Sequence, residues 1–151
     1  MIQRKQTLFL LFSMIMMAGY LFSPVVRMEG NGVATNITAW EMTHNIGFPV
    51  IGHYFVFVIA IAAGITIALN GITILLYNKR KLQAALCWLA ILPALFCFLY
   101  VYYNWATKEN VYDTIFYYGN ISPCVAIVFM LLAAFSIRAD ENLLRESSRL
   151  R

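Results

Sequence analysis

Residues 49–103 read PVIGHYFVFVIAIAAGITIALNGITILLYNKRKLQAALCWLAILPALFCFLYVYY, two long apolar runs separated by a short basic segment. A helix crosses the hydrocarbon core of a membrane, roughly 30 Å thick, with about 20 predominantly apolar residues. Both runs, 49–77 and 82–103, are long enough to do this. A connection as short as 78–81 favours antiparallel neighbours. The stretch therefore predicts a transmembrane helical hairpin. As a helix, the first run would measure about 40 Å, so it should tilt or project from the membrane.

Two further apolar runs, 7–26 and 114–137, flank this hairpin. Hydrophobic residues make up 62% of the 151-residue chain and charged residues 12%, whereas soluble domains average about 45–50% and about 25%. Such a chain needs lipid as part of its solvent. We predict an all-α membrane protein, one domain over residues 1–151, with four transmembrane helices in an antiparallel up-down bundle. The tail 138–151 is predicted to form a short C-terminal helix continuing from the fourth span.

The loop between the first two spans, residues 27–47, is polar and rich in Gly, Asn and Thr. Val33, Thr35, Ile37 and Ala39 alternate weakly with other residues. Alternation of this kind is typical of a half-buried strand. The sequence therefore predicts a short β-like excursion in this loop.

The basic residues give the chain an orientation, because Lys and Arg concentrate on the cytoplasmic side of membranes. Nine of the eleven lie in the two tails and the turn after the second span, and the other two are Arg27 and Lys108. Both termini are therefore predicted to be cytoplasmic. The net charge of +4 suits an anionic inner leaflet. It does not predict nucleic-acid binding, because no folded reading surface accompanies the charge.

Chemistry-bearing residues are few. No charged residue falls inside a predicted span, which argues against ion-coupled transport. His44 and His53, with Glu41 close in sequence, are weak candidates for a cofactor site at the outer face, but their spacing does not place them on one helix face. The sequence thus predicts no catalytic residue, no cofactor and no metal.

The second span carries a pattern typical of helix contacts. Ala60, Gly64 and Ala68 recur every four residues and Gly71 follows, a spacing that lets helices approach closely. Asn70 lies among them, and a polar side chain at this depth usually bonds a neighbouring helix. The pattern does not say whether that neighbour belongs to the same chain.

The two ends of the chain carry polar motifs. It opens Met1-Ile2-Gln3-Arg4-Lys5-Gln6-Thr7 and closes with Asp140-Glu141, Leu144-Arg145 and Ser148-Arg149-Leu150-Arg151. With its four-span layout, the chain resembles a family of small inner-membrane proteins of unknown function found in Bacteroidota. The resemblance implies a bacterial inner membrane and a four-helix domain, and it carries no activity or catalytic residue. The paired end motifs themselves suggest a cytoplasmic interaction between the start of the chain and its tail, involving Gln3, Arg4, Gln6, Arg145, Arg149 and Arg151.

Two function classes follow. We favour a non-enzymatic scaffold, assembly factor or small subunit of a membrane complex, with a membrane-protein partner or a second copy of the chain beside it. The alternative is a small-molecule or cofactor binder, carrier or enzyme that acts at the outer membrane face. It would use His44, His53, Glu41 and the aromatic residues at the outer ends of the last two spans.

Overall fold

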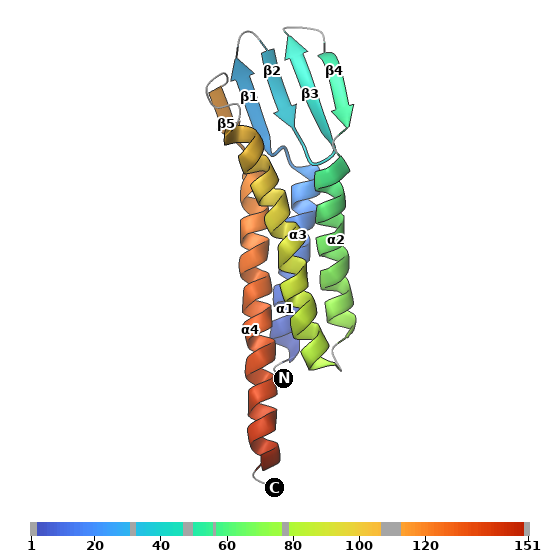
Figure 1. Ribbon diagram of the computed structural model, residues 1–151, viewed down its shortest axis with the longest axis vertical. Coiled ribbons are helices and arrows are strands. Elements are labelled where there is room, and N and C mark those ends of the chain that lie inside the picture. The colour runs from blue at the N-terminus through green and yellow to red at the C-terminus, as the bar shows by residue number, and fades with distance from the viewer. Residues whose placement is uncertain are drawn as a thin grey trace.

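The computed structural model describes residues 3–30, 33–46, 50–55, 57–76, 79–106 and 113–149. Within these residues, four long helices form a bundle, and a β-sheet lies on one end of it (Figure 1). All four helices are long and apolar enough to cross a membrane, which confirms the predicted four-helix membrane fold. The helices are α1 (Gln3–Phe22), α2 (Phe57–Leu75), α3 (Arg80–Ala106) and α4 (Ser122–Arg149).

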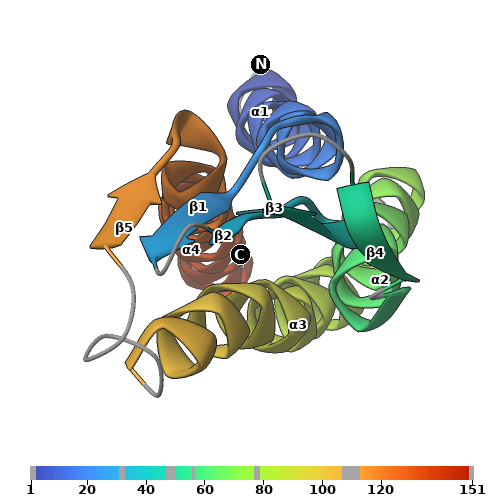
Figure 2. The ribbon, with the colours of Figure 1, turned by 90° about the horizontal axis from the view of Figure 1, so that it is seen from above.

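The helices make a closed ring in the order α1, α2, α3, α4, with α4 packed against α1 (Figure 2). We call the end that carries the sheet the sheet end. The opposite end, where α1 begins and α4 finishes, is the terminal end (Figure 1). At this end α4 extends beyond the other three helices, so the predicted C-terminal helix is the last part of α4 itself.

Every helix buries residues at alternating spacings of three and four, the pattern of helices packed nearly antiparallel in a bundle. The buried positions that follow this spacing are Gln6, Leu10, Ser13, Met17 and Tyr20 in α1; Ile59, Ala63, Thr66, Asn70 and Thr73 in α2; Gln83, Cys87, Ala90, Ala94, Cys97 and Val101 in α3; and Ala126, Met130, Ala133, Ile137 and Asp140 in α4.

Most of these buried residues are small or polar, while large apolar side chains such as Ile61, Leu92 and Phe135 are exposed on the outside of the bundle. In lipid, apolar side chains gain nothing by leaving the solvent. Helices therefore associate through close packing of small residues and through hydrogen bonds. The distribution of side chains is the one expected when the bundle is surrounded by lipid.

The sheet has five antiparallel strands in the order β4-β3-β2-β1-β5. The first four follow one another between α1 and α2, and β5 comes from the connection between α3 and α4. The predicted β-like excursion is confirmed as β2, but it is one part of a larger sheet. The strands are β1 (Val26–Gly30), β2 (Val33–Ile37), β3 (Glu41–Ile46), β4 (Val50–Phe55) and β5 (Asp113–Phe116).

The predicted span 49–77 is wrong over its first part, because Val50–Phe55 is β4 and α2 begins at Phe57. β-branched and aromatic residues suit a strand as well as they suit lipid, and an apolar run does not distinguish the two by itself. The 19 residues of α2 measure about 28 Å, close to the roughly 30 Å of a membrane core. The excess length predicted for this span therefore belongs to the sheet.

The predicted spans 7–26 and 114–137 also change at the sheet end. α1 finishes at Phe22, shortly before Pro24, and the chain enters β1. Residues 114–116 belong to β5, and α4 begins only at Ser122. Pro123 then occupies the first turn of α4, where its missing N–H leaves no bond unmade.

Candidate functional site

The junction between sheet and bundle holds the sheet in a defined position. The Trp40 indole N–H donates to the carbonyl of Leu21 at a distance of 2.7 Å. The last four carbonyls of a helix have no partner inside it, so Trp40 satisfies one of those of α1. The Val25 N–H donates to the Ile37 carbonyl at 2.9 Å, and the Tyr117 N–H donates to the Val25 carbonyl at 3.1 Å. The backbone just after α1 is therefore bonded to two separate segments.

A glycine completes this junction. Gly119 lies in a short 3₁₀ helix, η1 (Tyr118–Ile121), directly before α4. A Cβ added at Gly119 would lie 2.5 Å from the Pro24 carbonyl oxygen and 3.2 Å from the Ser23 Cβ. No real Cβ fits there, so η1 can approach the end of α1 this closely only with glycine at this position.

The described surface of the sheet includes an ion pair on β1, in which Arg27 Nη2 lies 2.5 Å from Glu29 Oε1. A hydrogen bond with Tyr117 and the nearby carboxylate of Glu29 raise the pKa of Arg27 above its ordinary value. Arg27 therefore stays charged. Both outer strands, β4 and β5, have a neighbour on one side only among the described strands.

The two candidate histidines lie on neighbouring strands, His44 on β3 and His53 on β4. They are not cross-strand partners, because His44 is opposite Gly52 and His53 is opposite Thr43. Their side chains and that of Glu41 lie outside the part of the chain whose side chains are described, so a cofactor role for them stays a prediction. Among the residues that are described, no group of three or more His, Cys, Asp and Glu could hold a metal ion.

The middle of the bundle contains a polar pair. The Asn70 Nδ2 atom donates to Ser13 Oγ at 2.9 Å, which links α2 to α1, and both residues are fully buried. Asn70 Oδ1 has no hydrogen-bond partner. Thr66 and Thr73 are also buried, but their hydroxyls donate to carbonyls one turn earlier in α2. Of these three polar residues of α2, Asn70 is therefore the one whose side chain forms a hydrogen bond with another helix.

The small-residue stripe of α2 does not form one contact surface within the chain. Ala60 is buried, but Gly64 and Ala68 are exposed on the outside of the bundle. A Cβ added at Gly64 would meet nothing within 4 Å, whereas one added at Gly71 would meet Met14 Cε at 3.9 Å. A contact of another chain with Gly64 and Ala68 stays a prediction.

The terminal end contains a second polar contact. Gln6 Nε2 of α1 donates to the carboxylate of Asp140 in α4, and the two residues are only 5% and 8% exposed. Gln83, in the first turn of α3 and one turn before Cys87, is also buried. Toward the middle of the bundle, Leu10 and Ile137 belong to the apolar cluster next to this polar layer.

This contact brings the beginning of the chain to the helix that carries the tail, as the end motifs suggested for Gln6. The partner, Asp140, was missed because the fourth span was predicted to finish at residue 137. The signal was present, since Asp140 continues the buried spacing of Ala133 and Ile137 by one step. Five predicted interaction residues lie outside the described side chains: Gln3, Arg4, Arg145, Arg149 and Arg151.

The chain is similar to a known protein family over nearly its whole length. Residues 2–150 match the family described as Domain of unknown function (DUF4293), which covers nearly the whole chain. The chain therefore belongs to this family. The comparison with curated proteins gives no significant match.

Proposed function

We propose that this family member is a non-enzymatic scaffold, assembly factor or small subunit of a membrane complex, and that it presents its sheet to a protein partner outside the membrane. The observation that carries the proposal is the free edge of β4. Six residues long, β4 pairs with β3 and ends the order of described strands. The opposite edge strand, β5, has only four residues.

An edge strand offers unpaired N–H and C=O groups to an extended segment of another chain. Exposed edges of this kind are usually kept short or covered because they promote unwanted pairing. The longer β4 edge is therefore the best place on the described sheet for a partner to add a strand. The bonds of Trp40, Val25 and Tyr117 would hold that surface in a constant position relative to the membrane.

The polar residues inside the bundle also support a structural role. The buried carboxylate, Asp140, is bonded to Gln6 at one end of the bundle, and Asn70 is bonded to Ser13. Both contacts join neighbouring helices. Among the described residues, Asp140 is the only Asp, Glu, Lys or Arg that the bundle buries. The described residues therefore give no row of charged groups across the bundle, as an ion-coupled carrier would need along the path of its substrate.

The location is part of the proposal. The charge distribution and the resemblance to Bacteroidota proteins favour a bacterial inner membrane with both termini in the cytoplasm. The sheet would then face the periplasm, opposite the nine basic residues of the tails and the basic turn. Reporter fusions after residue 151 and before residue 1 should both be active in the cytoplasm. Activity of either fusion in the periplasm would contradict this orientation.

A site-specific photocrosslinker tests the proposed docking edge. Placed at Ile51 or Tyr54 of β4 in cells, it should yield one discrete adduct with a protein, or with a second copy of the chain. The same probe at Asn36, in the central strand β2, is the matched control and should yield none. Adducts of equal strength at all three positions, or none at β4, would argue against the proposal.

The histidines separate the proposal from the cofactor-binding alternative. Replacing His44, which lies on β3, with Gln should leave the β4 adduct unchanged if the chain is a scaffold. Loss of a co-purifying pigment, metal or small molecule in that variant would favour the alternative.

A further inference from the structure

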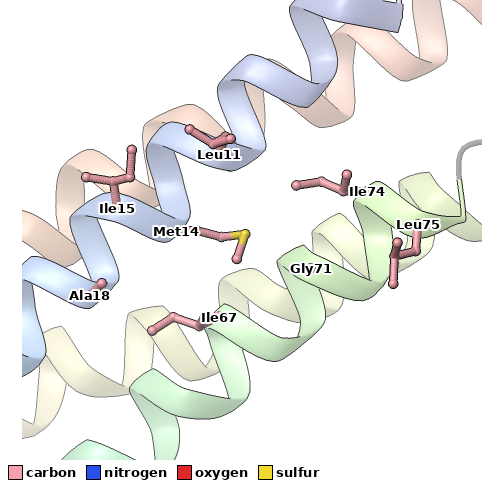
Figure 3. Close-up of a pocket in the computed structure, with 8 residues that line it drawn as sticks. All are labelled: Leu11, Met14, Ile15, Ala18, Ile67, Gly71, Ile74 and Leu75. Carbon is pink, nitrogen blue, oxygen red and sulfur yellow. The ribbon is translucent and has the colours of Figure 1, made fainter.

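A surface groove of about 550 Å³ runs between α1 and α2 (Figure 3). Its lining is entirely apolar, from Leu11 to Ala18 on α1 and from Ile67 to Leu75 on α2. Its volume lies within the roughly 300–1,000 Å³ that ligand pockets usually have. The groove opens to the outside of the bundle, since Leu11 and Leu75 are exposed, Leu75 by 76%.

Gly71 keeps the groove open. Met14 extends from α1 across the space between the helices toward Gly71 (Figure 3). A Cβ at Gly71 would touch only the end of Met14, at 3.9 Å. A larger side chain at Gly71 would therefore occupy the groove instead of entering the core of the bundle.

The length of the groove matches one leaflet of a bilayer. From Leu75, the last residue of α2, to Ile67 is eight residues, or about 12 Å of helix. One leaflet supplies half of the roughly 30 Å hydrocarbon core, about 15 Å. An acyl chain entering from the terminal end fits this length. A transmembrane helix of a partner would cross the whole core and leave more than half of its length outside the groove.

Charge at the terminal end suits an anionic headgroup. The exposed side chain of Lys79 lies directly beyond α2, in a segment where Arg80 and Lys81 follow. The described acidic side chains of this end, Asp140 and Glu141, lie on α4, which is across the ring from α2. A phosphate one turn beyond Leu75 would therefore meet Lys79, and none of the acidic side chains that the structure describes at this end lies on α1 or α2.

We propose that the groove between α1 and α2 binds one acyl chain of an anionic phospholipid from the leaflet at the terminal end, with the lipid phosphate at Lys79. This site is independent of the docking edge on β4. A lipid bound at this site differs from the lipids that merely surround the bundle, because its binding requires both the apolar groove and the basic segment.

The groove is tested by filling it. The full chain is reconstituted in nanodiscs of equal parts phosphatidylcholine and phosphatidylglycerol, released into mild detergent and examined by native mass spectrometry. Gly71→Leu should remove the phospholipid adduct seen with the unaltered chain. Gly64→Leu, on the same helix but in open space, is the matched control and should retain it. If Gly71→Leu retains the adduct as well as Gly64→Leu does, the proposal is wrong.

A second filling variant, Ala18→Leu, approaches the groove from α1 and should have the same effect as Gly71→Leu. It keeps the test decisive if Gly71→Leu fails to fold, which circular dichroism of the purified variant would reveal. An adduct retained by a folded Ala18→Leu variant would overturn the proposal.

The headgroup is tested by charge. Lys79→Gln should lower the preference for phosphatidylglycerol over phosphatidylcholine by about fivefold, the effect of one basic residue near an anionic lipid. Lys81→Gln is the control of equal charge change and should alter that preference less. An unchanged preference in Lys79→Gln, or equal changes in both variants, would refute the role of Lys79.

Discussion

The buried contact between Gln6 and Asp140 predicts a measurable coupling between the two ends of the chain. Gln6→Ala leaves a buried carboxylate without its donor, and an unsatisfied buried group costs about 1–3 kcal/mol, with charged groups at the upper end. This contact lies at the end of the bundle, near water, so we expect a loss of about 2 kcal/mol. Asp140→Ala leaves only a neutral amide unpaired and should cost about 1 kcal/mol.

The double variant measures the bond itself. If the residues acted independently, the double variant would lose about 3 kcal/mol, the sum of the single losses. Because each single change breaks the same bond, we expect the double variant to lose about 2 kcal/mol, a coupling of about 1 kcal/mol. Hydrogen bonds between membrane helices couple by about 0.6 kcal/mol on average and at most about 1.7, so this value lies in the observed range.

The assay is reversible unfolding in mixed micelles, with sodium dodecyl sulfate as the denaturant and helix content followed by circular dichroism. Asp140→Asn is the control, because its carbonyl oxygen can still accept from Gln6, and it should lose less than Asp140→Ala. Single losses that add to within about 0.3 kcal/mol would refute the reasoning, since additivity means that the residues do not interact.

Three further changes test other contacts. Gly119→Ala should destabilise the protein by about 1–3 kcal/mol in the same unfolding assay, because its Cβ would overlap the Pro24 carbonyl, whereas Gly19→Ala, which meets nothing within 4 Å, should not. Trp40→Phe should cost about 1 kcal/mol by removing the bond to the Leu21 carbonyl, seen as faster limited proteolysis of the sheet. N-ethylmaleimide should modify Cys124 first in the folded protein, since the other two cysteines are buried, and intact mass should show one adduct before unfolding.

The helices were predictable because length and apolar composition alone decide whether a segment can cross a membrane. The residues at which the helices begin and end near the sheet could not be predicted. The residues of β4 are mostly apolar, so they could not be distinguished from the first turns of α2. Pairing of β1 with β5 joins segments far apart in the sequence, and no local pattern indicates such a partner. The alternation that begins at Val33 is a local pattern, and it could predict only the strand in which it lies, β2.

The candidate sites were predictable only in part. Asn70 stands out as a polar residue within an apolar span, but its partner Ser13 looks like an ordinary small residue of α1. Spacing by fours selected Gly64 and Ala68, which are exposed, while the buried face of α2 runs from Ile59 through Thr66 to Thr73 in alternating steps of four and three. Hydrophobic residues line both the core and the lipid surface, so their positions do not reveal which face of a membrane helix is inside.

The contacts between α1 and α4 have a consequence for how the protein is made. Of the four described helices, α1 is synthesised first and α4 last. The two are joined near both ends of the bundle, by Gln6 with Asp140 and by β1 with β5. Shifting α4 by a single turn would break both connections together. α4 must therefore insert in one alignment relative to α1, and β1 can pair with β5 only after the chain has been synthesised past α3.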